Sequence, residues 1–510
     1  MIDSLVSLGQ GFEVALTPMN LLFIFVGVCL GQLIGALPGL GPSAGMALLL
    51  PITFGIPPAT AIMMLAGIMY GGMYGGTLTS VLVNVPGEAA SVMTAVDGHK
   101  LAKQGRAGAA LSVSAIGSFL AGIGAVVALV FVTPPLAEFA LSFSSPEYFL
   151  LATLGITATA SIGSGSPIKA ILMAVFGLMI ALVGTDPILG SSRLTFGVTE
   201  LLDGIDFLPV AIGIFGIAEV LASLEQSYDS EPIKTRLKDM WLSGKDWAEC
   251  RIAILRGGTL GFFIGLMPGA GPTVAAILAY VTEKRFSRHP ERFGDGALDG
   301  VAAAESANNS AAHGALIPML ALGIPGSAST AVLLAALVLQ GIRPGPALLV
   351  EQADLVWGLI ASMFIGNVIL LVLNLPLAPL FASLLRVPYE YLAPGILVIS
   401  LVGAYATTLS LFSVGLTLFF GMVGYLMMKA DLPRAPVVLA VVLASLMESS
   451  LRQSLMLSEG SLSIFVQRPL SAILLLLVIA SLLLPLMSMF TRHRAKRRSR
   501  NEQQISIATK

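Results

Sequence analysis

The sequence predicts an all-α, polytopic membrane protein made of two inverted-topology repeats with re-entrant hairpins and broken helices. Three observations predict this fold class. Of the 510 residues, 56% are hydrophobic and only 11% are charged, whereas about a quarter of the residues of a soluble domain are charged. Apolar runs of about 20 residues, which are long enough to cross a bilayer as helices, recur along the chain. Finally, a motif rich in glycine and proline is written twice.

The duplicated motif is Gly35-Ala-Leu-Pro-Gly-Leu-Gly-Pro42, which recurs as Gly265-Leu-Met-Pro-Gly-Ala-Gly-Pro272. Further landmarks follow it in the same order in both halves, including a Pro-Gly pair that begins at Pro86 and again at Pro325. The alternative is a chance match between two stretches rich in glycine and proline. An ordered series of landmarks argues against chance, so we interpret the chain as a duplication.

The landmarks also set the expected domain boundaries. The first membrane repeat is expected at residues 18–225 and the second, inverted repeat at 253–452. A polar cytoplasmic linker, 226–252, separates them. An extra transmembrane helix is expected at 469–490, followed by a basic cytoplasmic tail at 491–510.

The distribution of lysine and arginine predicts the orientation of the repeats, because cytoplasmic loops are enriched in these residues. The loops at 97–106 and 283–292 are basic. Their counterparts in the other repeat are not: the segment near Gln340 carries one arginine, and the segment at 53–58 carries no charged residue. One member of each pair is therefore expected inside and the other outside, as in an inverted repeat. With an external N-terminus and an internal C-terminus, we expect about eleven crossings (roughly 10–12).

In each copy, the Pro-Gly-x-Gly-Pro motif interrupts an apolar segment near its middle. Proline removes a backbone donor and clashes with the preceding turn, so a helix is expected to end at Pro38 and at Pro268. We expect residues 22–53 and 255–282 to form re-entrant hairpins with the glycines at their tips. The alternative is a kinked helix that spans the membrane.

New helices are expected to start near Ser43 and Thr273, and again after the second breaks at 84–87 and 323–326. The free amides of a helix N-terminus carry a partial positive charge and favour anions. Paired breaks that meet at the bilayer midplane are how many secondary transporters build their binding sites. We therefore expect an anion site shared by the two repeats.

The residues expected to contact substrate are the glycines, hydroxyls and amides at these breaks. They are Gly39, Gly41, Ser43, Asn84, Gly87, Ser91, Gly269, Gly271, Thr273, Asn308, Asn309, Gly326, Ser327 and Ser329. A coupling cation is expected at Glu88, Ser310 and Thr330. Two alternatives stay open, namely that the polar cluster at 305–313 is structural and that Glu88 only caps a helix.

Several function classes find no support in the sequence. It contains no GxxxxGK[ST] phosphate-binding loop, no His/Cys cluster with metal-ligand spacing and no GxSxG nucleophile motif. An enzyme and a resident metal or cofactor are therefore not expected. Cation-coupled secondary transport of a small organic anion is the simplest interpretation, and a passive channel is the alternative.

The motifs at 35–42, 70–76 and 84–88, with the Pro325-Gly326 pair, resemble the large membrane subunit of tripartite tricarboxylate transporters (TctA-type). The resemblance covers about residues 15–490. It implies a bacterial inner-membrane carrier for tricarboxylates or related carboxylates, with a periplasmic N-terminus and a cation gradient of Na⁺ or H⁺ as the driving force. It also implies two partners, a small membrane subunit and a periplasmic solute-binding protein that delivers the substrate.

Overall fold

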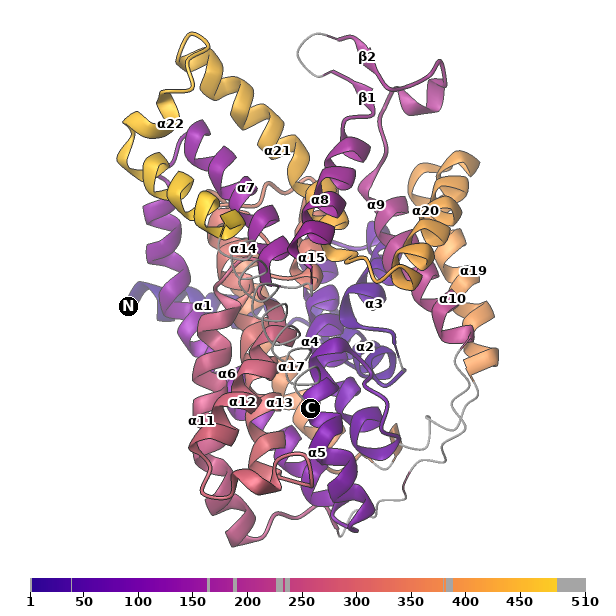
Figure 1. Ribbon diagram of the computed structural model, residues 1–510, viewed down its shortest axis with the longest axis vertical. Helices are drawn as coiled ribbons and strands as arrows, with labels where there is room; N and C mark the ends of the chain where they lie inside the picture. The colour runs from indigo at the N-terminus through magenta and orange to yellow at the C-terminus, as the bar shows by residue number, and fades with distance from the viewer. Residues whose placement is uncertain are drawn as a thin grey trace, which may run out of the picture.

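The computed structural model describes residues 2–37, 39–162, 166–186, 190–225, 233, 239–378, 380–381 and 389–483. These residues are almost entirely helical, apart from one short antiparallel pair of strands, β1 (Gly184–Thr185) and β2 (Ser192–Arg193) (Figure 1). Seven of the described helices are long and apolar enough to cross a membrane. The chain is therefore an all-α polytopic membrane protein, as predicted.

The two halves contain similar series of helices (Figure 1). The first half contains α1 (Ile2–Ala15), α2 (Pro18–Gly35), α3 (Pro42–Leu49), η1 (Leu50–Gly55), α4 (Pro58–Leu82), η2 (Ala89–Ser91), α5 (Val92–Lys103), α6 (Ala107–Ala140), α7 (Ser145–Ile162), α8 (Pro167–Ala181), η3 (Thr199–Leu201), α9 (Phe207–Ala211), the π-helical η4 (Ile212–Ile217) and α10 (Ala218–Leu224). The second half contains α11 (Gly244–Gly265), α12 (Gly271–Phe286), η6 (Pro290–Arg292), α13 (Leu298–Gly314), α14 (Leu316–Leu322), α15 (Ala328–Leu339), α16 (Leu348–Glu351), α17 (Ala353–Asn374), α19 (Tyr389–Thr408), α20 (Leu411–Lys429), α21 (Ala435–Leu457), α22 (Ile464–Gln467) and an apolar helix at Pro469–Leu483.

Some expected boundaries differ from the observed ones. Helix α11 begins at Gly244, inside the expected linker, because Ser243 and Asp246 form a capping box that starts a helix there. The N-terminal segment before the first repeat is also helical, as α1. Pro38, most of 226–238, and the chain after residue 483, including the basic tail, lie outside the described residues.

The number of long apolar helices is lower than the expected number of crossings. Helix α13 is not among the seven because it has only 17 residues and is rich in polar side chains, although all of it is buried. Other candidates, such as α8 and α15, are apolar but shorter than 18 residues. A polar helix such as α13 can lie inside the protein, away from lipid, so apolar length alone does not count it.

Glycines at every fourth position show that α2 and α4 run parallel. The residue numbers of the contacting positions increase together along both helices: Gly27 lies against the backbone of Met64, Gly31 against that of Ile68 and Gly35 against that of Gly72. A chain that leaves α2 and enters α4 in the same direction must come back between them. Helix α3 and η1 are therefore the returning arm of a re-entrant hairpin.

The second half repeats this packing at the corresponding positions. Glycines of α11 lie on the backbone of α13 in the same rising order: Gly257 on Ala303, Gly261 on Ala307 and Gly265 on Ala311. Helix α12 is therefore the returning arm of a second re-entrant hairpin. Both hairpins are confirmed, and the alternative of a kinked spanning helix is wrong.

The equivalent helices α4 and α13 run in opposite directions. Tyr70 of α4 stacks on His313 near the end of α13, with ring centroids 5.6 Å apart. Thr77, further along α4, lies beside Glu305, which is earlier in α13. Figure 1 agrees, because α5 lies in the lower part of the view and its counterpart α15 lies in the upper part. The two repeats are therefore inverted.

Polar contacts connect neighbouring segments at both ends of the helix bundle. At one end, the Tyr280 hydroxyl donates to Asp97 at 2.7 Å, and Lys100 pairs with Asp295 at 2.8 Å. The basic loops expected on one side of the membrane therefore do meet. At the other end, Arg452 pairs with Asp186 at 2.7 Å.

The parallel packing of α2 on α4 predicts a stability difference between two glycine substitutions. A methyl group at Gly31 would lie 2.5 Å from the carbonyl oxygen of Ile68, so Gly31→Ala must push the helices apart. We expect this to cost about 1–3 kcal/mol, the usual range for overpacking. The measurement is the thermal unfolding midpoint of the purified protein in detergent.

Gly124 of α6 is the matched control, because a methyl group there would meet nothing within 4 Å. Alanine is the better helix former, so Gly124→Ala should leave the midpoint unchanged or raise it slightly. A wild-type midpoint for Gly31→Ala would contradict the close approach of α2 and α4.

Candidate functional site

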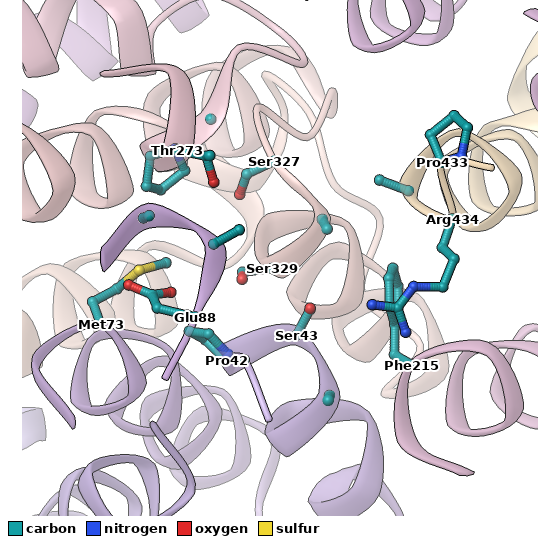
Figure 2. Close-up of a pocket in the computed structure, with 18 of the residues that line it drawn as sticks. Pro42, Ser43, Met73, Glu88, Phe215, Thr273, Ser327, Ser329, Pro433 and Arg434 are labelled. Carbon is teal, nitrogen blue, oxygen red and sulfur yellow. The ribbon is translucent and has the colours of Figure 1, made fainter. Parts of the chain in front are cut away.

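One cavity of about 510 Å³ lies where the two repeats meet. It is lined by the N-terminal ends of α3, α12 and α15, by the segment that contains η2, and by residues of η4, α10 and the connection between α20 and α21. Figure 2 shows hydroxyl side chains from both halves around this space: Ser43, Thr273, Ser327 and Ser329. Both repeats therefore contribute hydroxyl side chains to this cavity.

The two hairpin tips start their returning helices just before Ser43 and Thr273. Helix α3 begins at Pro42 and α12 at Gly271, with a proline in the first turn of each. Proline suits this position because its fixed backbone angle matches the helix and its missing donor is not needed there. The helices therefore start near Ser43 and Thr273, as expected, although neither residue caps its helix. Both residues line the cavity.

The second breaks differ in how their helix starts are capped. The Ser327 hydroxyl accepts a hydrogen bond from the Thr330 amide at 3.2 Å at the start of α15. In the first repeat Glu88 occupies the corresponding place, and its amide donates to the Ser91 hydroxyl at 3.4 Å. Glu88 therefore occupies the N-cap position of η2, and its side chain lines the cavity.

The tips and breaks pack in the same way in both repeats. A Cβ atom on Gly41 would lie 3.9 Å from that of Glu88, and one on Gly271 would lie 3.6 Å from that of Ser327. In each repeat, the hairpin tip therefore lies beside the helix start that follows the second break. Two equivalent clusters of backbone amides face one shared space.

Ten of the residues expected at the site line this cavity. They are Gly39, Gly41, Ser43, Gly87, Glu88, Gly269, Gly271, Thr273, Ser327 and Ser329. The structure brings them together from four separate segments. Whether they bind a ligand stays a prediction.

Four other expected residues lie in or next to the segments that form the cavity wall, but they do not line the cavity. Asn84 ends α4 with a left-handed backbone angle φ of 63° and an exposed side chain. The carbonyl of Gly326 accepts a hydrogen bond from the Gly269 amide at 3.0 Å and so fixes the second hairpin tip. Ser91 and Thr330 are engaged in the capping interactions described above.

The expected polar residues of α13 lie behind the cavity. Asn308 donates to the carboxylate of Glu88 at 3.0 Å, and Asn309 donates to Ser118 of α6 at 2.7 Å. Ser310 faces away from both, and its hydroxyl donates to the carbonyl of Gly258 at 2.7 Å. Only Asn308 of these three therefore contacts a residue of the cavity wall.

An arginine in the cavity wall was not expected. Arg434 pairs with Glu219 at 2.7 Å, donates to the carbonyl of Ile214 at 3.1 Å, and lies over the ring of Phe215 with 5.8 Å between guanidinium and ring centre. Figure 2 shows Arg434 and Phe215 across the cavity from the hydroxyl side chains. We had expected carboxylate binding to depend on helix N-termini and hydroxyls alone.

The π-helix η4 positions this arginine. A π-helical turn widens the helix and often occurs at functional sites, and here it contains both Ile214 and Phe215. A signal was present in the sequence, because Arg434 lies between Pro433 and Pro436 in a segment that corresponds to another interrupted region of the first repeat. The residues 429–434 indicate orientation in the sequence as a net-positive loop, and Arg434 was not predicted as a site residue.

The chemistry of the cavity suits a small anion. The contacts that Arg434 makes to Glu219 and to Ile214 both use Nη1, whereas a guanidinium carries five donors. Helix N-termini, hydroxyls and an arginine are the groups that bind carboxylates. Among the described residues, no group of three His, Cys, Asp or Glu side chains could hold a metal ion.

Comparison with known proteins agrees with this architecture. The sequence model of the tripartite tricarboxylate transporter TctA family matches residues 21–439. A protein of Agrobacterium vitis, described as an uncharacterized 52.8 kDa protein in the TAR-I ttuC' 3'region, is 44% identical over 496 residues, which are 97% of this chain and 99% of that protein.

A second relative from Agrobacterium vitis, described as an uncharacterized protein in the TAR-II ttuC' 3'region, is 40% identical over 227 residues. These residues are 44% of this chain and 94% of that protein. No solved structure matches the chain. The family is a transporter component and not an enzyme family, and the chain belongs to it: it is a member of the tripartite tricarboxylate transporter TctA family.

Proposed function

We propose that this protein is the large transmembrane subunit of a cation-coupled secondary transporter that imports tricarboxylates or related organic carboxylates. The substrate is delivered by a periplasmic solute-binding protein, and a small membrane subunit completes the assembly. The protein lies in the bacterial inner membrane with a periplasmic N-terminus and a cytoplasmic C-terminus. Membership of a tripartite transporter family supports the existence of other subunits.

One observation carries the proposal for an anionic substrate. A single cavity between inverted repeats collects three helix N-termini, five hydroxyl residues (Ser43, Thr159, Thr273, Ser327 and Ser329) and the guanidinium of Arg434. Each of these groups favours negative charge. Inverted repeats around a central site are also the usual architecture for alternating access.

Membrane energetics explain why the transport must be coupled. With a negative cell interior, importing an anion costs about 2.3 kcal/mol per charge for each 100 mV of membrane potential. A trivalent carboxylate would therefore cost about 7 kcal/mol at 100 mV. Co-transport of at least as many cations, or entry in a partly protonated form, offsets this cost.

Uptake by reconstituted vesicles tests the function. We expect vesicles that contain this protein, the small subunit and a loaded binding protein to accumulate a labelled carboxylate when an inward Na⁺ or H⁺ gradient is imposed. Collapsing that gradient with an ionophore should abolish accumulation. Citrate, a dicarboxylate and an aromatic acid are the candidate substrates to compare, because an amide-lined site accepts each of them.

The alternative function is a passive channel for small organic anions. A channel would let the carboxylate equilibrate but never accumulate above its external concentration. Equilibration that is insensitive to both ion gradients would therefore overturn cation-coupled transport. It would leave the anion-binding cavity in place.

A further inference from the structure

Helix α13 crosses the interior of the protein with every residue buried, yet it carries a set of polar atoms without partners. Four buried side-chain oxygens on it make no hydrogen bond within the described residues: Oγ of Ser306 and the three acceptors Oε2 of Glu305, Oδ1 of Asn308 and Oδ1 of Asn309. These side chains are at most 1% exposed. Positions i, i+3 and i+4 share one face of a helix, so Glu305, Asn308 and Asn309 face the same side of α13.

The identity of these atoms as acceptors does not depend on how the amides are rotated. The amide nitrogen of Asn308 donates to the carboxylate of Glu88, and that of Asn309 donates to the backbone carbonyl of Glu305 at 3.3 Å. The backbone carbonyl of Glu305 can only accept, so the amide nitrogen of Asn309 must face it and the amide oxygen is left over. The amide nitrogen of Asn308 faces Glu88 in the same way when that carboxylate is ionised. A buried acceptor without a donor is costly, which points to a positively charged ligand.

The two carboxylates in this region also lack a cationic side chain. Glu305 accepts a hydrogen bond from the hydroxyl of Thr94, and Thr77 is a second hydroxyl partner of its carboxylate. None of the ion pairs that the described residues form includes Glu88 or Glu305. Ionised groups inside a membrane protein need a counter-charge, and here the protein supplies only neutral hydroxyls and amides.

We propose that Glu305 and Asn308, together with Glu88, bind a sodium ion. Hard cations prefer carboxylate, amide and hydroxyl oxygens, which are the groups that α13, Glu88 and the two threonines provide. A divalent ion usually takes a shell rich in carboxylates, and the described residues offer no group of three such ligands. The inference rests on the proposed function, because it assigns the coupling ion a place.

Glu88 connects this sodium site to the anion cavity. The carboxylate of Glu88 accepts a hydrogen bond from the amide of Asn308. The same side chain also lines the anion cavity (Figure 2). A bound cation neutralises Glu88, which otherwise repels an anionic substrate. Sodium binding therefore prepares the cavity for the carboxylate, and the anion is expected to bind more tightly in sodium than in choline.

The test measures sodium binding without any substrate. We expect the thermal unfolding midpoint of the purified protein to rise by a few degrees in sodium chloride and to saturate. Choline chloride and potassium chloride at the same ionic strength and pH should give no such rise. Glu305→Gln and Asn308→Ala should each abolish the sodium-dependent rise and reduce the binding of radioactive sodium at least tenfold.

Glu147→Gln is the matched control, because Glu147 is a buried carboxylate whose oxygens accept from Arg468, Ser471 and the amide of Ser144. This variant should have a lower midpoint and an unchanged sodium response. If Glu305→Gln does not fold, the Asn308→Ala variant alone decides the outcome.

Two results would overturn the sodium site. One is a wild-type protein whose midpoint responds equally to sodium, potassium and choline, or only to pH, which would indicate a proton in place of a metal ion. The other is a full sodium response in both variants. The sodium-binding test contains no carboxylate substrate, so its failure would not argue against carboxylate uptake. A failed uptake assay would likewise not argue against sodium binding.

Discussion

Replacing Arg434 with glutamine is expected to reduce carboxylate uptake by at least about tenfold. The guanidinium lies in the cavity wall, where a charge-assisted hydrogen bond to a carboxylate contributes about 1.5–3 kcal/mol. Each 1.4 kcal/mol corresponds to a tenfold change in affinity. Initial uptake rates in vesicles, measured across a range of substrate concentrations, would show the loss as a raised half-saturation concentration.

Arg434→Gln also removes the ion-pair partner of Glu219. Glu219 is only 8% exposed. An uncompensated buried charge costs on the order of 3 kcal/mol, so Arg434→Gln should also lower the thermal midpoint. The double variant with Glu219→Gln removes both charges and should recover most of that stability. Recovery of uptake along with stability would show that Arg434 serves only the fold and does not contact the substrate.

Replacing Gly269 with alanine is expected to abolish uptake while the protein still inserts into the membrane. The backbone angle φ of Gly269 is +79°, which costs other residues about 1–2 kcal/mol. A methyl group there would also lie 2.3 Å from the backbone nitrogen of Thr159. The second hairpin tip must therefore shift, and its amides then no longer face the cavity.

Gly105→Ala is the matched control, because Gly105 has the same backbone angle φ of +79° but does not line the cavity. A methyl group there would meet nothing within 4 Å. This variant carries the same backbone cost and should keep measurable uptake. Native uptake by Gly269→Ala, with normal expression checked by membrane fractionation, would contradict the assigned role of the second tip.

The sequence determined the membrane class, the duplication and the inversion of the repeats. These features depend on properties that repeat along the chain, namely apolar length, the distribution of lysine and arginine, and the paired Pro-Gly motifs. Proline and glycine act through their own backbone restrictions, so the helix interruptions at Gly269 and Gly87 could be predicted without knowledge of the contacts. Their shared cavity followed from the symmetry alone.

Only the tertiary structure decided which polar residues face the cavity and which lie behind it. Arg434 is near the start of α21 in sequence, and it reaches the cavity because the π-helical turn at 212–217 places Ile214, Phe215 and Glu219 around it. In the same way, Asn308 and Ser310 are two positions apart on α13 but point to different sides. Contacts between residues more than 200 positions apart depend on helix packing, which no local pattern in the sequence encodes.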